Sequence, residues 1–170
     1  RLLAERNGKP VSASVVQVNA SGKQAQSDTD NNRSPETYIG YARSSDHFVS
    51  VGGYRKAHAK HYVLPNILDL NDWGLVGDWT VRKEQATLMK KGGRIAFRFH
   101  ARDLHLVLGP SKNNQPVRFR VTLDEGNVPG EDAGEDVNAR GEGVVTTQRL
   151  YQLIRQKGTI RERTFVIEFL

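Results

Sequence analysis

The chain has no cysteine and only one methionine among its 170 residues. Without cysteine, disulfide bridges, thiol redox catalysis and Cys-ligated zinc or iron–sulfur sites are excluded within these residues. No run of about eighteen apolar residues is present, so no membrane contact is predicted for this chain. The start, "RLLAERNGKP", lacks an initiating Met, a signal-peptide apolar run and a small-residue cleavage site. We therefore expect a fragment or a processed piece of a longer protein.

Charge is unevenly distributed along the chain. The net charge is +6, yet residues 124–142 hold seven acidic residues and one basic residue. The remainder carries a clear positive excess, which is the charge that a nucleic-acid partner requires. The basic residues are nevertheless scattered, with no recognition-helix pattern, RNA-binding signature or spaced aromatic platform. Nucleic-acid binding is accordingly not predicted.

Two segments of different character make up the chain. "RLLAER" has the mixed apolar and charged pattern of a helix and stops at Asn7-Gly8, a usual C-cap. The stretch that follows is rich in Ser, Asn, Asp, Gln and Lys, with only "SVVQV" able to form a short strand. Residues 1–33 are therefore predicted to be a short helical remnant plus a linker, and residues 34–170 a single domain.

Alternation of apolar and polar residues marks several short strands after Ser34. In "GGRIAFRFHARDLHLVLGP" the inward parity changes at "ARD", which predicts a bulge or a tight bend. "PVRFRVTLD" alternates in the same way, and "RLYQLIRQ" and "TFVIEFL" are predicted to form a hairpin that turns at Lys157-Gly158. Short strands with Gly-rich turns and no long amphipathic helix predict an all-β fold, an antiparallel β-sandwich of the jelly-roll type.

The outward parity of two predicted strands is basic. Arg98 and His100 lie in "RIAFRFH", whereas Arg118 and Arg120 lie in "VRFRV". These side chains come together only if the two strands are neighbours, which periodicity does not establish. Because antiparallel sheets commonly turn one polar face to water, a solvated surface is the expected interpretation. The alternative is a docking face for an anionic or hydroxyl-rich partner.

The aromatic residues fall into two groups. Trp73 and Trp79 share parity with Leu75 and Val81 and are predicted to be core residues. Four tyrosines lie in less periodic segments and are better candidates for exposed rings that contact a ligand: Tyr38, Tyr41, Tyr54 and Tyr62. The candidate ligand-binding residues are Tyr38, Tyr41, Arg98, His100, Arg118 and Arg120.

No metal site, catalytic residue or cofactor is predicted. In "EDAGEDVNARGEG" oxygen-bearing residues alternate as calcium ligands do, but Arg140 stands where a ligand oxygen belongs. The acidic segment 124–142 is therefore expected to be an exposed and mobile loop, with a basic surface of the same protein or of a second copy as its hypothesised partner. The "HAKH" pair, His58 and His61, has no third ligand in view. No nucleophile elbow and no glycine-rich phosphate loop occur.

Several motifs resemble a known family when taken in order along the chain. They are "SPETYIGYARS", "NDWGLVGDWTV", "GGRIAFRFHARDLHLVLGP", "VRFRVTLD" and "RLYQLIRQ". Over most of residues 34–170 the chain resembles the C-terminal jelly-roll domain of DipZ-like and related redoxin proteins, which is similar to carbohydrate-binding modules. The resemblance implies that "RLLAERNG" is the tail of a thioredoxin-like helix and that the reactive cysteines belong to an upstream oxidoreductase or antioxidant domain. It favours an extracytoplasmic location.

The resemblance implies a non-catalytic accessory domain, for which two binding roles remain open. In one, the domain binds a carbohydrate or cell-envelope polymer through the tyrosines and the basic face. In the other, it docks the upstream thioredoxin-like domain, another subunit or a protein client. The residues alone do not choose between these partners.

Overall fold

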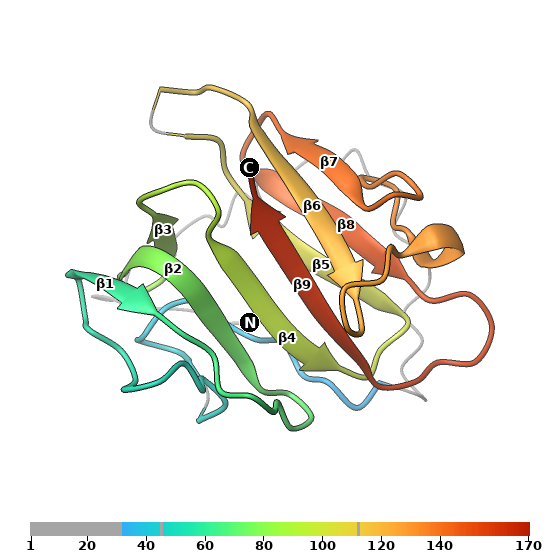
Figure 1. Cartoon of the computed structure of the whole chain (residues 1–170), viewed down its shortest axis with the longest axis horizontal. Helices are drawn as coiled ribbons and strands as arrows, with labels where there is room; N and C mark the ends of the chain where they lie inside the picture. Colours follow the sequence, from blue (N-terminus) through green and yellow to red (C-terminus); the bar gives the residue numbers. More distant parts are fainter. Residues whose placement is uncertain (1–31, 45, 112) are drawn as a thin grey trace, which may run out of the picture.

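The computed structural model describes residues 32–44, 46–111 and 113–170, which fold into two packed β-sheets. The larger sheet has seven strands in the order β1-β2-β4-β9-β6-β7, with β3 also paired to β2, and the smaller sheet consists of β5 and β8. In Figure 1 the smaller sheet lies behind β4, β9 and β6. The predicted all-β antiparallel sandwich is confirmed. The helical remnant and the "SVVQV" strand lie outside the described residues.

The strands within the described ranges are short. Their bounds are β1 Ala59–Tyr62, β2 Trp73–Val81, β3 Ala86–Leu88, β4 Arg94–Phe99, β5 Asp103–Leu108, β6 Val117–Leu123, β7 Glu142–Val145, β8 Arg149–Arg155 and β9 Arg163–Phe169, with one 3-10 turn, η1, at Gly130–Asp132. No helix in this part of the chain is long and apolar enough to cross a membrane.

The core lies between the two sheets. Strand β2 turns Trp73, Leu75, Trp79 and Val81 inward, each at most 3% exposed, as their shared parity predicts. Tyr62 on β1 is fully buried beside them, so the expectation of an exposed ring is wrong at this position. Its neighbour in the fold, Tyr54, stacks on Phe48 with ring centroids 3.9 Å apart. These two tyrosines are packing residues because aromatic rings offer the largest apolar area available to fill the core.

The parity change at "ARD" is a crossing between sheets. Strand β4 belongs to the large sheet and β5 to the small one, so residues 100–102 carry the chain around the edge of the core. A register shift also occurs between Leu104 and His105, where β5 pairs with β8. The predicted bend is thus present, with a bulge beyond it.

The predicted β8–β9 hairpin is wrong. Strand β8 pairs with β5 in the small sheet, whereas β9 lies between β4 and β6 in the large sheet. The segment around Gly158 therefore crosses from one sheet to the other. A Gly in a turn fixes a local reversal of the chain but carries no information about which strands pair afterwards.

Candidate functional site

The two predicted surface tyrosines lie beside the β2–β3 turn. Backbone bonds from Tyr41 N–H to Arg82 O and from Ala42 N–H to Lys83 O, both 3.0 Å, attach their segment to that turn. The guanidinium of Arg43 lies 3.8 Å above the Tyr38 ring, so one face of that ring is occupied.

Both tyrosines also have partners in their own neighbourhood. The Tyr38 hydroxyl donates to Glu36 Oε2 at 2.6 Å, and this bond raises the pKa of Tyr38. The Tyr41 ring packs against the core and has Lys56 Nζ 5.3 Å from its centroid. In each tyrosine an intramolecular cation therefore lies over one of the two ring faces on which a sugar ring could stack.

Arg98 and His100 lie at the end of β4, where residues 32–34 of the chain bind. The His100 N–H donates to Ser34 Oγ at 2.8 Å and the His100 O accepts from Arg33 N–H at 3.0 Å. One Glu162 carboxylate binds both Arg98, at 3.3 Å, and Arg33, at 3.4 Å. Asn71 adds a hydrogen bond from Nδ2 to Arg33 O at 3.4 Å. We call residues 32–34 with these partners the entry strap.

The entry strap leaves two buried polar atoms without a hydrogen-bond partner in the described structure. These atoms are His100 Nδ1 and Asn71 Oδ1. Asn71 has a φ of 73°, and its N–H donates to Arg98 O at 2.8 Å. Asn tolerates this left-handed conformation better than most residues do. Sequence reasoning missed Asn71, Glu162 and Ser34 because their partners Arg33, Arg98 and His100 lie between 27 and 129 residues away in the chain.

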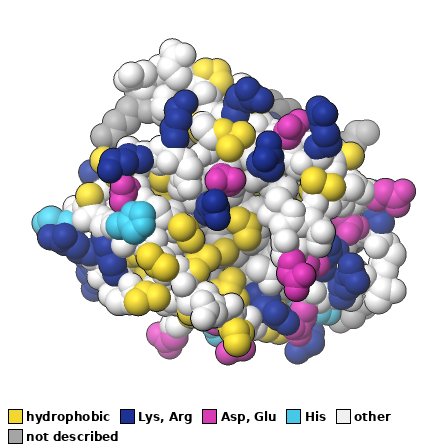
Figure 2. Space-filling model, in the orientation of Figure 1, with side chains coloured by type: hydrophobic (Ala, Val, Ile, Leu, Met, Phe, Trp, Pro, Cys, Tyr) yellow, Lys and Arg dark blue, Asp and Glu magenta, His cyan; other side chains and the backbone are white. Residues whose placement is uncertain are grey.

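The basic face is a ladder of alternating charge. Arg94 on β4 and Arg120 on β6 both lie opposite Glu168 on the intervening strand β9, and Arg120 also lies opposite Glu142 on β7. Arg94 Nη2 lies 3.2 Å from Glu168 Oε1. Figure 2 shows acidic side chains among the basic ones across this face.

Glu142 of the ladder is held in its charged form. The pKa of Glu142 is lowered, first by the hydrogen bond from Asn138 and then by Arg140, with smaller contributions from Arg120 and Arg118. A surface on which acids alternate with bases presents a weaker positive field to an anionic partner than an uninterrupted basic face does.

The six candidate residues do not form one site. Strand β9 separates β4 from β6, so Arg98 faces Thr164 while Arg120 faces Glu168, at the other end of β9. Arg118 is exposed farther along β6, opposite Val144. The tyrosine pair lies near the β2–β3 turn, away from both. The predicted set is thus divided among three places: Arg98 with His100, Arg118 with Arg120 on β6, and Tyr38 with Tyr41.

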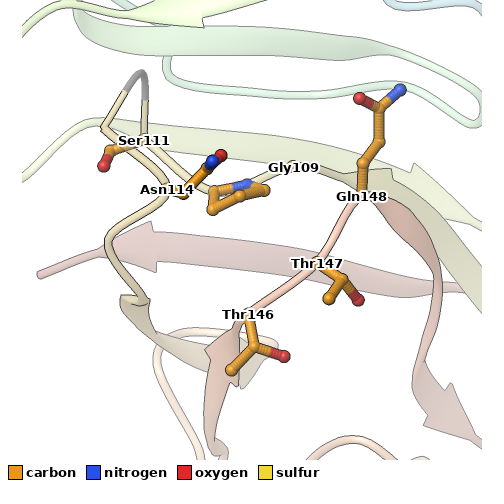
Figure 3. Close-up of a pocket in the computed structure, with 7 residues that line it drawn as sticks. Gly109, Ser111, Asn114, Thr146, Thr147 and Gln148 are labelled. Atoms are coloured by element: carbon orange, nitrogen blue, oxygen red, sulfur yellow. The ribbon is translucent and has the colours of Figure 1, made fainter.

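A shallow cleft of about 480 Å³ lies at the loop end of the sandwich and was not foreseen from the sequence. It is lined by neutral residues of two loops: Gly109, Pro110, Ser111, Asn114, Thr146, Thr147 and Gln148. Figure 3 shows the side chains of Gln148 and Thr147 pointing away from the Ser111 loop. Recognition of a sugar requires polar groups that converge on one point, and the hydroxyl and amide groups of this cleft do not converge.

The acidic segment is bound through its carboxylates to basic residues of the same chain. Asp136 accepts two bonds from Arg149, at 2.6 and 3.1 Å, and one from the Gln152 N–H at 2.8 Å. Asp124 and Asp132 both bind Arg163, whose side chain is only 8% exposed. Pairing with cations outside the segment relieves the repulsion between its acids.

No group of three potential metal ligands occurs within the described ranges. His58 Nδ1 contacts the Lys56 carbonyl at 2.9 Å, whereas His61 Nδ1 contacts Asp78 Oδ1 at 2.8 Å. The two histidines of the "HAKH" pair therefore have separate partners and do not face a common point.

Comparison with family models places residues 34–170 in the family described as "Thioredoxin like C-terminal domain". The chain belongs to this family. The match begins at Ser34, so this thioredoxin-like C-terminal domain contains every described strand and all of the entry strap except residues 32 and 33. A search of curated proteins finds no match. The family description states where such domains lie in their proteins and names no ligand.

Proposed function

We propose that this chain is a non-catalytic accessory domain that docks an upstream thioredoxin-like domain of the same polypeptide and fixes its position. The supporting observation is the entry strap. The Arg33 N–H donates to His100 O, Ser34 Oγ accepts from the His100 N–H, and Glu162 bridges Arg33 to Arg98. A chain that entered the domain through a free tether would need no such bonds. A fixed entry point limits how far a preceding domain can lie from His100 and Glu162.

Accessory function without catalysis also agrees with the chemistry of the chain. It has no cysteine to act as a thiol nucleophile. The reacting groups in this proposal belong to the upstream domain, and the present domain contributes binding and placement alone. No cofactor is required for that role.

Carbohydrate or cell-envelope binding, the other role open from the sequence, has less support. Arg43 covers one face of the Tyr38 ring, Lys56 Nζ lies 5.3 Å from the Tyr41 ring centroid, and Glu168 and Glu142 lie among the arginines of the basic face. The polar cleft lacks a convergent hydrogen-bonding set. A sugar site needs an open aromatic face together with aligned polar groups, so docking is the better-supported role.

The test is whether the two domains of the full-length polypeptide tumble together. We expect one common rotational correlation time by ¹⁵N relaxation, and separate times after Glu162→Gln combined with Ser34→Ala. The matched control is Glu131→Gln, which changes an exposed carboxylate on η1. Independent tumbling of the unmodified domains would contradict the proposal. Glycan-array binding by the chain, with independent tumbling, would favour the carbohydrate role instead.

A further inference from the structure

The loop between β1 and β2 carries an unusual concentration of exposed apolar side chains. Its sequence from residue 63 to 70 is "VLPNILDL", with Ile67 77% exposed and Val63 51% exposed. Val51, 58% exposed, joins them through a bond of 2.8 Å from its N–H to the Val63 carbonyl. Figure 2 shows hydrophobic side chains gathered over β2, β4 and this loop. We call Val51, Val63 and Ile67, with the half-buried Leu64, Leu68 and Leu70, the loop surface.

The loop surface is held in place by the sheet beneath it. Gly74 turns toward the outer face of β2, and a Cβ added there would lie 2.5 Å from Leu64 Cδ2. Leu64 therefore occupies the space that a side chain at position 74 would need. The end of the loop is fixed by a bond of 2.9 Å from Asp69 N–H to Asp72 Oδ2. A preformed apolar surface avoids the ordering entropy that a flexible loop would lose on binding.

Apolar exposure of this kind indicates a contact face. Soluble monomers rarely leave large aliphatic side chains clustered in water, and such clusters with a polar rim are typical of interfaces. The rim here includes Lys60, whose Nζ binds the carbonyls of Val51 and Gly53 at 3.0 and 2.7 Å, and the Arg98–Glu162 pair. The remaining question is which molecule covers the surface.

We infer that the loop surface is the docking face for the thioredoxin-like domain that precedes residue 32 in the same polypeptide. This inference rests on the proposed function and names its interface. Asn71 follows the loop directly, and its Nδ2 binds the Arg33 carbonyl at 3.4 Å. Arg33 therefore lies at the border of the loop surface. A domain tethered there meets this surface at high effective concentration, so a modest apolar contact is enough to hold it.

Exposed apolar residues on the opposite face of the sandwich can be compared with the loop surface. Val107 and Leu150 are cross-strand partners on the small sheet and are 62% and 52% exposed. They have the same apolar character but belong to the other sheet, and the entry strap makes no bond to either strand that carries them. Val107 is thus a matched control position.

The first measurement compares amide chemical shifts of this chain with those of the same residues in the full-length polypeptide. We expect the differences to concentrate at residues 51 and 63–70. Differences concentrated around Val107 and Leu150, or around Thr146–Gln148, would overturn the inference while leaving docking itself intact. The absence of any difference, with independent tumbling, would instead refute the proposed function.

The second measurement uses Ile67→Asp and, as control, Val107→Asp in the full-length polypeptide. Burying one large aliphatic side chain contributes enough that Ile67→Asp should weaken docking on the order of ten- to a hundredfold, and Val107→Asp should not. Both positions are exposed, so thermal unfolding of the isolated chain should change little. Unchanged docking in Ile67→Asp would overturn the inference, as would concentration-dependent dimers of the isolated chain that Ile67→Asp abolishes.

Discussion

Arg163 on β9 and Asp124 in the turn after β6 are joined by an Nε–Oδ2 contact of 2.5 Å, although 39 residues separate them in sequence. Asp132, at the end of η1, binds the same guanidinium through Nη1 at 2.9 Å. Asp124 also accepts the Thr164 N–H at 2.9 Å, so the pair ties the turn to β9. Arg163 thus anchors the acidic segment to the edge of the core.

Arg163→Ala should destabilise the domain by about 2–3 kcal/mol, because it leaves two partly buried carboxylates without their cation. This loss of stability is smaller than is usual when a fully buried ion pair is broken, because the Asp124 side chain is 39% exposed. Urea unfolding at neutral pH measures the change. The control is Arg118→Ala, an exposed position at which a change within about 0.5 kcal/mol is expected. Equal effects of the two substitutions would contradict this role of Arg163.

Asp103 should make the domain sensitive to acid. Burial raises the pKa of Asp103, but bonds from Arg155 at 2.7 Å and Arg102 at 2.8 Å outweigh it and hold that pKa below its ordinary value. A carboxyl with a lowered folded pKa stabilises the fold above its unfolded pKa. That stabilisation is lost as the pH falls through the folded pKa, here from about pH 5 downward.

Asp103→Asn should therefore lower the free energy of unfolding by roughly 1–3 kcal/mol at pH 7. The difference between the variant and the unmodified chain should shrink as the pH falls below about 4. Urea unfolding at a series of pH values measures it. A difference that stays constant from neutral to acidic pH would show that the charge of Asp103 is not the cause.

Gly141 should tolerate no side chain. Its φ is +83°, and an added Cβ would lie 2.0 Å from the Val121 carbonyl oxygen. Because that oxygen belongs to the backbone of β6, it cannot move aside as the end of a flexible side chain could. Gly126 has a similar φ of +89° but nothing within 4 Å of the same position. Gly126→Ala should then cost about 1 kcal/mol from backbone strain alone, and Gly141→Ala clearly more than twice that. Thermal unfolding of the two variants provides the comparison, and similar losses would refute the steric argument.

The isolated chain should show no thiol-disulfide exchange. The exchange requires a thiolate to attack a disulfide, and the chain contains no cysteine. An insulin-reduction assay with dithiothreitol should match the rate without protein. Acceleration by purified chain, free of contaminating thioredoxin, would show that the chain performs chemistry assigned here to the upstream domain.

The strand periodicity of the sequence determined the class of fold and most of the core. Trp73, Leu75, Trp79 and Val81 could be placed inside from parity alone, because the side chains of a strand alternate between its two faces. The same rule correctly predicted strands at "PVRFRVTLD" and "TFVIEFL" and a bend at "ARD". The absence of cysteine likewise excluded thiol chemistry without any structure.

Only the tertiary structure decided which strands are neighbours, and hence which polar residues meet. Strand β9 lies between β4 and β6, which separates Arg98 from Arg120 and gives the basic face its acids. The partners of the entry strap and of the acidic segment are likewise distant in sequence. Parity is a local property of the backbone, whereas strand order depends on how all the apolar faces pack at once. For that reason the sequence predicted a two-layered sandwich, whereas the strand order of the fold determined which polar side chains meet on its surface.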